Sequence, residues 1–261
     1  MPKRWNGRFL VLFAVLLLTA CSPIGLRQSV KPQQSLTQDG GVQLTLRASC
    51  PPTAPTCNLA KERDAAIGVL TRRLAGRSDV HDPAIRADGP TNIIVDLPGI
   101  LDSTQIPDIT SLLTSSGSVA ILDTGSGVLP VGANTAGKTC ASACEAGQYH
   151  IAFTGDQIDR KQVVAQIDNQ SGQWVVQFGF AGSARQQFAS YTASHIGEYL
   201  TITLDDVVVE SAIIQSEIDG AGQISGVNEA EAQQIATYLN SGSLPAILTV
   251  VSSELVTPSA G

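Results

Sequence analysis

The sequence predicts an α+β fold, in which helices and strands mix without the regular alternation of a parallel α/β protein. Runs that alternate apolar and polar residues are typical of strands, and they lie on both sides of segments with the apolar period of a helix. Two expected strands also follow each other directly, as in a hairpin, which favours α+β over a doubly wound sheet. The 261 residues can bury a substantial core, as one large domain or two small ones.

The first expected elements lie between residues 42 and 122. Residues 42–48 alternate apolar and polar side chains, which predicts a strand. Residues 59–74 place apolar side chains along one face at helical spacing, with charged side chains opposite. The remaining elements expected in this part are a buried strand at 92–97, a short helix at 106–113 and a strand at 118–122.

The second group of elements follows residues 124–147, a stretch rich in Gly, Ala, Ser and Thr that predicts a long connection. Residues 199–204 and 207–210 are expected to form a hairpin that turns at Asp205 and Asp206. The other elements expected here are strands at 149–153, 173–180 and 244–251 and helices at 184–194 and 228–239.

The N-terminal segment predicts export from the cytoplasm. Three basic residues, Lys3, Arg4 and Arg8, precede an apolar run at 9–18, which closes with Leu18-Thr19-Ala20-Cys21. This run is much shorter than the roughly 20 residues that a membrane helix needs. Residues 1–20 are therefore expected to be a cleaved signal peptide.

Leu18-Thr19-Ala20-Cys21 also resembles the lipobox of bacterial lipoproteins, in which the cysteine carries lipid and becomes the mature N-terminus. We therefore expect Cys21 to anchor the chain to the extracytoplasmic side of the cell membrane. The alternative is ordinary secretion, with Cys21 as a plain thiol. Residues 21–38 are rich in Gln, Ser and Pro and are expected to form a flexible tether.

The charge balance excludes two classes of partner. The net charge is −7, and three of the 16 basic residues but none of the 23 acidic ones lie within the first 20 residues. Affinity for nucleic acid depends on Lys and Arg that neutralise phosphates. Attachment to anionic lipid depends on clusters of the same residues. We therefore expect no nucleic-acid partner and expect the lipid anchor alone to hold the chain at the membrane.

Four further cysteines, Cys50, Cys57, Cys140 and Cys144, predict two disulfides, since an even number is typical of an oxidising compartment. Their spacing allows two local loops or two cross-links between the segments, and the sequence alone does not choose among the three connectivities. A four-thiolate zinc site is the alternative, but its usual spacing is two to four residues in both pairs. No metal and no other cofactor is expected.

Residues 132–139 match the phosphate-binding pattern G-x4-G-K-[ST], with Lys138 as the phosphate ligand. That function needs a strand before the loop and a helix after it. Here Pro130 interrupts the approach, and a cysteine-containing Ala, Ser and Gly segment follows. We therefore expect no nucleotide site.

Asp123-Thr124-Gly125 resembles the loop that carries the catalytic aspartate of aspartic peptidases. That chemistry needs two carboxylates that share one proton. The motif occurs once, so a homodimer would be required. His81 lies between two aspartates and is expected to be a solvated loop residue rather than a metal ligand. No convincing catalytic set remains, and the chain is not expected to be an enzyme.

The last third of the chain carries the most specific pattern. Residues 199–214, 218–226 and 239–245 resemble the large extracytoplasmic domain of SecD, the accessory subunit of the bacterial protein-export translocase. Earlier segments resemble the same domain in the same order. They are residues 39–46, 72–77, 93–99, 154–158 and 173–178, and residues 257–261 complete the series.

The resemblance implies a ferredoxin-like base subdomain interrupted by an α+β head subdomain. Residues 39–123 and 227–261 would form the base, and residues 124–226 the junction and the head. Asp206 stands where the family usually has Gly, and Ala212 where it usually has Pro. The edge of the head is therefore expected to differ in detail from the family.

The resemblance also implies a non-enzymatic protein that binds polypeptide or acts as a scaffold, auxiliary to Sec-dependent export. Its expected partners are unfolded secretory polypeptides and Sec translocase subunits. Two alternatives stay open: a peptidase-like homodimer that uses Asp123, and a SecD-like fold with an unrelated role in the envelope. The expected polypeptide contacts lie on the hairpin, where β-augmentation could occur, at Tyr199, Thr201, Thr203, Asp205, Val207 and Val209.

Overall fold

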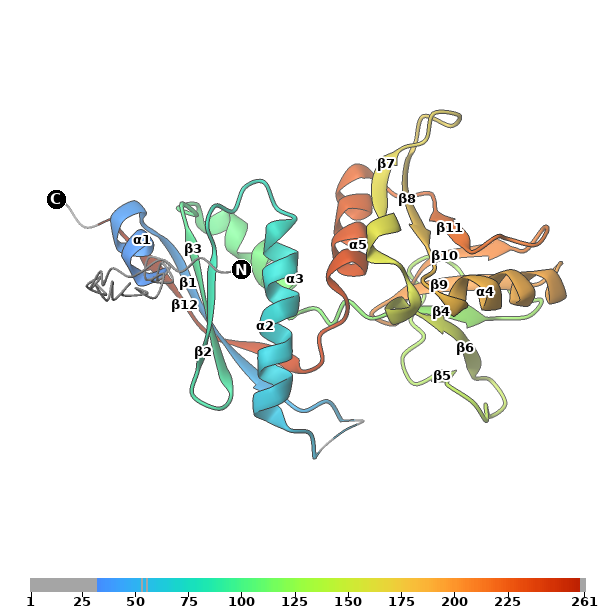
Figure 1. Ribbon diagram of the computed structural model, residues 1–261, viewed down its shortest axis with the longest axis horizontal. Helices are drawn as coiled ribbons and strands as arrows, with labels where there is room; N and C mark the ends of the chain where they lie inside the picture. Colours follow the sequence, from blue (N-terminus) through green and yellow to red (C-terminus); the bar gives the residue numbers. More distant parts are fainter. Residues whose placement is uncertain (1–31, 53, 55, 259–261) are drawn as a thin grey trace, which may run out of the picture.

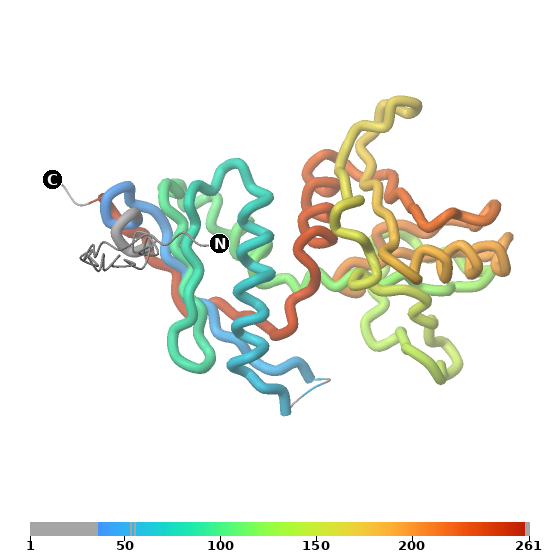
Figure 2. The backbone as a smooth tube through the Cα atoms, in the orientation of Figure 1, coloured from blue at the N-terminus to red at the C-terminus, as the bar shows by residue number. Residues whose placement is uncertain are grey.

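The computed structural model describes residues 32–52, 54 and 56–258, which form an elongated molecule of two lobes (Figure 1). The chain crosses between the lobes twice, once in its first half and once near its C-terminal end (Figure 2). The predicted signal peptide, Cys21 and most of the predicted tether lie outside the described residues. Within the described ranges, no helix has the length and apolar character needed to cross a membrane.

The first lobe, called the base here, has a ferredoxin-like fold. Its elements are β1 (Gly41–Ser49), α2 (Leu59–Ala75), β2 (Ala84–Asp88), β3 (Asn92–Pro98), α3 (Ile106–Thr114) and β12 (Ile247–Val256). The sheet is antiparallel with the order β12-β1-β3-β2, and both helices pack against it. This is the β-α-β-β-α-β arrangement of the ferredoxin-like fold. The predicted α+β class and the predicted ferredoxin-like base are confirmed.

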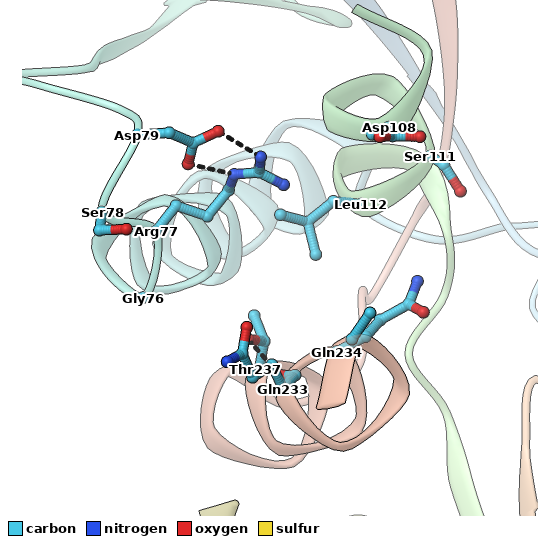
Figure 3. A pocket seen from close by; sticks show the side chains of 11 residues that line it. Gly76, Arg77, Ser78, Asp79, Asp108, Ser111, Leu112, Gln233, Gln234 and Thr237 are labelled. Carbon is cyan, nitrogen blue, oxygen red and sulfur yellow. Dashed lines mark hydrogen bonds and ion pairs between the residues drawn. The ribbon is translucent and has the colours of Figure 1, made fainter. Parts of the chain in front are cut away.

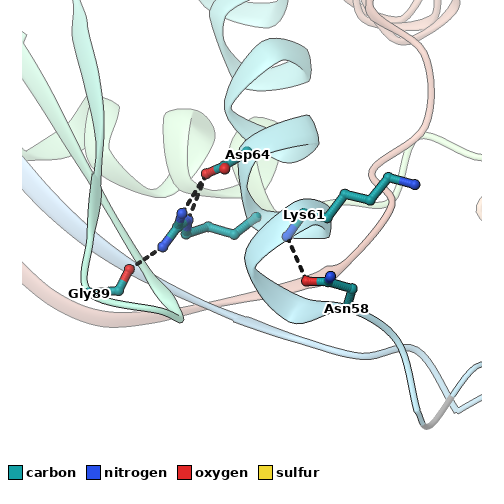
Figure 4. A network of polar contacts seen from close by, with 5 residues as sticks. Asn58, Lys61, Asp64 and Gly89 are labelled. Carbon is teal, nitrogen blue, oxygen red and sulfur yellow. Dashed lines mark hydrogen bonds and ion pairs between the residues drawn. The ribbon is translucent and has the colours of Figure 1, made fainter.

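The base forms where the sequence pattern predicts it. In β1 the alternating Val42, Leu44 and Leu46 are fully buried, because one face of the sheet packs on the helices. Asn58 begins α2 by accepting a hydrogen bond from the backbone N–H of Lys61 (3.2 Å), as Figure 4 shows. The same figure shows a second polar contact, in which Arg63 pairs with Asp64 and donates to the carbonyl of Gly89. That bond ties α2 to the turn between β2 and β3.

The structure contains a helix that the sequence analysis does not predict. This helix, α1 (Pro32–Asp39), lies almost entirely within residues 21–38, which are expected to be tether. Leu36 is buried, and its Cδ1 approaches Gly41, at the start of β1. A helix of eight residues is marginal in isolation and depends on such tertiary packing. The sequence offers a single apolar anchor without periodicity, which explains why the pattern does not predict α1.

The second lobe, called the head here, contains two sheets and two helices. Its elements are β4 (Val119–Asp123), β5 (Thr139–Cys140), β6 (Tyr149–Thr154), β7 (Val164–Ile167), β8 (Trp174–Gly179), α4 (Ser183–Ser194), β9 (Tyr199–Leu204), β10 (Val207–Ile213), β11 (Ala221–Ile224) and α5 (Glu229–Ser241). One sheet has the strand order β10-β9-β4-β6-β5 and the other has the order β11-β8-β7.

The two lobes have separate apolar cores, and these cores place the boundary differently from the sequence analysis. Strand β4 pairs with β6 and β9, and Val119 and Ile121 belong to the core of the head. Helix α5 buries Ile235 and Leu239 in that same core, whereas Leu244 belongs to the core of the base. The head therefore begins before β4 and ends after α5, and the expected boundaries at 123/124 and 226/227 do not follow the packing. The head is an insertion between α3 and β12.

Arg73 of α2 is buried where the chain crosses between the lobes. Its guanidinium donates to the carbonyls of Leu112 (2.7 Å), Ser115 (2.6 Å) and Ser116 (2.8 Å), which lead from α3 to the head. The guanidinium carbon also lies 4.8 Å from the ring centroid of Tyr238 in α5. Burial lowers the pKa of Arg73 to about 10, so the side chain remains charged at neutral pH. The guanidinium of Arg73 thus connects α2 with α5 and with the segment that leads from α3 to the head.

The four described cysteines form two local disulfides, one in each lobe. Cys50 pairs with Cys57 across the loop after β1, with Cα atoms 5.7 Å apart. Cys140 pairs with Cys144 in the connection between β5 and β6, with Cα atoms 5.4 Å apart. Of the three connectivities that the sequence leaves open, the structure has the one with two short loops.

Candidate functional site

The predicted hairpin is present as β9 and β10. Asp205 and Asp206 form its turn, both with positive φ (48° and 62°), as a two-residue type I′ turn requires. The carboxylate of Asp205 accepts hydrogen bonds from the backbone N–H groups of Gly117 (3.1 Å) and Ser118 (2.8 Å). Asp205 therefore fixes the turn of the hairpin against the first crossing from the base.

The structure corrects the prediction that β9 supplies contacts for an incoming polypeptide. Strand β9 lies between β10 and β4, so it has no free edge. Thr201 and Thr203 are buried, and the Thr201 hydroxyl lies 2.8 Å from the hydroxyl of Ser211 and 3.2 Å from that of Thr124. The polar face of β9 is thus covered by the connection after β4. Neither threonine can contact an incoming chain.

The other four predicted contact residues are more accessible. Val207 is exposed, whereas Tyr199, Asp205 and Val209 are half-buried. Tyr199 is tied to the end of β4, since its N–H donates to Gly125 (2.7 Å). Val209 packs against the core of the head. Of the six predicted contacts, Val207 is the one that offers an exposed side chain on β10, the outer strand.

The outer edge of β10 has a covered half and an open half. Val208 exchanges two backbone hydrogen bonds, of 2.9 and 2.8 Å, with residues 132–133 of the long connection. Beyond the strand, the N–H of Ile214 donates to Glu198 on the β9 side (2.8 Å). Backbone groups of successive residues in a strand point alternately to opposite sides. The N–H of Ile213 therefore points to the open half of the edge.

An apolar groove of about 90 Å³ lies beside this open half. Its walls come from both sheets of the head and from α4, and they include Phe178, Phe188, Leu200, Ile213 and Ile218. Ile213 is 44% exposed, so part of the apolar wall is accessible to a ligand. The aromatic rings behind the groove pack on one another, with Phe180 and Phe188 at a centroid distance of 4.4 Å. A rigid apolar wall thus adjoins an unpaired strand edge.

Glu210 is the carboxylate of this groove. It accepts hydrogen bonds from the hydroxyl (2.7 Å) and the backbone N–H (3.3 Å) of Ser225. Burial raises the pKa of Glu210, and the bonds from Ser225 oppose that shift. The groove therefore combines apolar walls with one acceptor that could receive a backbone N–H from a bound chain.

A larger cavity, of about 440 Å³, lies between the lobes and has polar walls (Figure 3). Arg77 and Asp79 form an ion pair on the α2 side, and Gln233, Gln234 and Thr237 face it from α5. The hydrogen bond from Arg77 lowers the pKa of Asp79. Asp108 adds a further carboxylate to this polar wall, and the described residues that line the cavity include no free strand edge like the one beside the groove.

The phosphate-binding pattern at residues 132–139 lacks the structure that such a site needs. The segment consists of turns that lead into β5, and β6 rather than a helix is the next element after β5. The backbone N–H of Lys138 donates to Thr135 (2.9 Å), and its carbonyl accepts from Tyr149 (2.7 Å). The backbone of this loop is therefore paired within the head and does not form a phosphate cradle.

Asp123, the residue of the peptidase alternative, is half-buried at the end of β4. Its carboxylate accepts a hydrogen bond from the N–H of Gly125 (2.9 Å). His195 and Glu198 lie beside it, with one polar side-chain atom of each residue within 4.8 Å of the others. Asp123 thus lies beside a histidine and a second carboxylate of its own chain, neither of which the peptidase hypothesis included.

Comparison with known proteins identifies the head. A family model described as the P1 head subdomain of SecDF matches residues 142–246, which include α5, in agreement with the packing of that helix. Protein translocase subunit SecD of Acetobacter pasteurianus is 32% identical over 245 residues, which are 89% of this chain and 44% of that protein. SecD of Acidaminococcus fermentans is 30% identical over 259 residues, which are 98% of this chain and 54% of that protein.

The chain thus spans about half the length of these curated relatives. The homology is to a translocase subunit family that is not enzymatic, in agreement with the prediction for this chain. Two solved structures of SecDF share the fold. One, in a super-membrane-facing form, has a TM-score of 0.67 at 24% identity and covers 84% of this chain and 31% of that one. The other, described as a membrane component that enhances protein export, has a TM-score of 0.64 at 23% identity, over 80% of this chain and 98% of that one.

Proposed function

Because residues 142–246 are homologous to the P1 head subdomain of SecDF, we propose that this chain binds extended polypeptide segments outside the cytoplasmic membrane and assists protein export. The observation that carries the proposal is the open edge of β10 beside the apolar groove. An extended chain that pairs with such an edge gains main-chain hydrogen bonds, and alternate side chains enter the groove. This mode recognises unfolded segments without requiring one sequence.

The covered half of β10 limits where a chain could pair. The backbone groups of Val208 are already hydrogen-bonded to residues 132–133. A bound polypeptide would therefore begin to pair beyond the bulge at Val209 and extend along Ser211 and Ile213. Glu210 lies within the groove at the same level. An extended segment of three to four residues spans roughly 10–13 Å at the strand rise of 3.2–3.4 Å per residue. A short apolar segment therefore suits this edge best.

The proposal includes a lipid anchor at Cys21, with the head and base on the extracytoplasmic side. It is supported by the basic start, the short apolar run and the Leu-Thr-Ala-Cys sequence at residues 18–21. Sec translocase subunits are the proposed partners in the membrane, because the curated relatives are translocase subunits. Co-purification from detergent-solubilised membranes, probed for translocase subunits, tests this part of the proposal.

The test of polypeptide binding replaces Ile213 with Pro in the full chain. Proline removes the N–H at the open edge and is tolerated on outer strands, so the head should remain folded. Loss of one backbone hydrogen bond, about 0.5–1.5 kcal/mol, should weaken binding of an unfolded secretory polypeptide by about 2- to 12-fold. Binding is measured by fluorescence anisotropy of the labelled polypeptide. Circular dichroism first establishes that the fold is retained.

Ile213→Val is the matched control, since it keeps the N–H and most of the apolar side chain. It should bind within about twofold of the wild type, a difference of about 0.4 kcal/mol. Equal affinities of the Pro and Val variants would exclude pairing at this edge. If the wild-type chain binds no unfolded polypeptide at all, the proposal of polypeptide binding is wrong. The description of the fold would be unaffected.

A further inference from the structure

A second cluster of polar side chains lies where β4 ends, α4 ends and β9 begins. Asp123 is the last residue of β4, His195 directly follows α4, and Glu198 precedes β9. One potential ligand atom from each side chain lies within 4.8 Å of the other two, and all three are half-buried. We propose that these three residues bind a divalent transition-metal ion of the zinc class.

The ring of His195 is held by hydrogen bonds at Nδ1. Its Nδ1 lies 2.7 Å from the carbonyl oxygen of Tyr191 and 2.9 Å from the hydroxyl of Ser194. Since a carbonyl only accepts, Nδ1 carries the proton in the neutral ring, and Nε2 keeps the lone pair that binds a metal. The ring also stacks on Tyr191, with centroids 3.9 Å apart and planes at 13°. Metal-binding histidines are commonly fixed by such a bond from the other nitrogen.

The two carboxylates bring negative charge without a cationic side chain beside them. None of the ion pairs among the described residues involves Asp123 or Glu198. Tyr191, whose ring stacks on His195, also lies beside Asp123. A bound cation would relieve the repulsion between the two acidic groups.

The donor set indicates which class of metal fits. Calcium and magnesium prefer oxygen ligands alone, whereas one imidazole with two carboxylates suits zinc and its neighbours. Zinc binds these ligands at about 2.0–2.2 Å, which puts ligand atoms of a tetrahedral ion about 3.3–3.6 Å apart. Small side-chain rotations would close the cluster to that spacing and leave the fourth position to water. Asp123, His195 and Glu198 together are thus sufficient for an open zinc site.

A bound metal ion would stabilise the end of the hairpin that lies away from its turn at residues 205–206. The backbone of residues 197–198 exchanges two hydrogen bonds of 2.8 Å with Ile214, just beyond β10. A metal held by His195 and Glu198 would therefore fix the segment against which the end of β10 is paired. This inference does not depend on polypeptide binding, because the cluster faces different residues from those of the groove.

Titration calorimetry tests the site with zinc chloride on the full chain, freed of metal by a chelator and of any histidine tag. We expect one zinc ion per chain in this cluster. His195→Ala, Asp123→Asn and Glu198→Gln should each weaken zinc binding by at least about tenfold. His81→Ala, which replaces a histidine of the base, is the matched control and should bind as the wild type does.

Each variant is first compared with the wild type by circular dichroism without metal, so that loss of binding is not confused with unfolding. If the His195 variant is unfolded, the near-isosteric Glu198→Gln decides the question. Zinc should also raise the melting temperature of the wild type and of the His81 variant, and raise that of the cluster variants by less at the same zinc concentration. No zinc binding by the wild type, or unchanged affinity in the Asp123 and Glu198 variants, would overturn the proposal. An anomalous zinc peak located elsewhere in a crystal would do the same.

Discussion

Replacement of Arg73 with Met is expected to destabilise the connection between the two lobes. Methionine retains the length of the side chain but donates no hydrogen bond. The carbonyl of Leu112 would stay buried without a partner, at a cost of about 1–3 kcal/mol. Water can reach the carbonyls of Ser115 and Ser116 more easily, because that segment is partly exposed.

The lost contact with the ring of Tyr238 adds about 0.5–2 kcal/mol. The lowered pKa of Arg73 reflects the energetic cost of burying its charge. Methionine carries no charge, so the variant avoids that cost and recovers part of the lost stability. We therefore expect a net loss of about 2–3 kcal/mol in the free energy of unfolding. At about 2–4 °C per kcal/mol for a chain of this size, the melting temperature should fall by about 4–12 °C.

Differential scanning calorimetry of the full chain measures the change, and Arg72→Met is the matched control. Arg72 is exposed and donates to a single carbonyl, that of Ser241, at 3.0 and 2.8 Å. Its replacement should change the free energy of unfolding by less than about 1 kcal/mol. Equal melting temperatures for the Arg73 and Arg72 variants would refute the role assigned to the buried guanidinium.

Three further predictions concern the anchor, the disulfides and the groove. Cys21→Ser should release the chain from the membrane fraction or leave it unprocessed, as fractionation and mass spectrometry would reveal; normal processing and anchoring would contradict the lipid anchor. Peptide mapping without reductant should find Cys50 joined to Cys57 and Cys140 joined to Cys144, and free thiols at these positions would contradict the structure. Glu210 has a raised pKa in the folded chain. Its contribution to the free energy of unfolding is therefore fully present below the pKa of an unfolded glutamate, about 4.3. That contribution is lost as pH rises through the pKa of Glu210 in the folded chain. Glu210→Gln should therefore gain stability relative to the wild type as pH rises above about 4.3, and an unchanged difference in stability between the two proteins at about pH 4 and at neutral pH would contradict the assignment.

Local patterns determined many elements of this protein, although not α1, β2, β7 or β11. The alternation in β1 and the helical period in α2 follow from which side of each element is buried, and both are visible within a few residues. The helix α5 begins where the sequence predicts it, with a capping box in which Asn228 and Glu231 exchange hydrogen bonds of 2.9 and 3.0 Å. The hairpin turn at residues 205–206 is equally local. These features depend on near neighbours in the chain, so the sequence alone predicts them.

Only the tertiary structure decided where these elements pack. The pattern of β9 predicts a strand with a polar face, but the docking of β4 against it made β9 an inner strand and buried Thr201. The same docking placed β4 and α5 in the head. It also brought Asp123 to His195 and Glu198, residues that no local spacing relates. Periodicity specifies which face of an element is buried but not which partner covers it, because pairing depends on residues far apart in the chain.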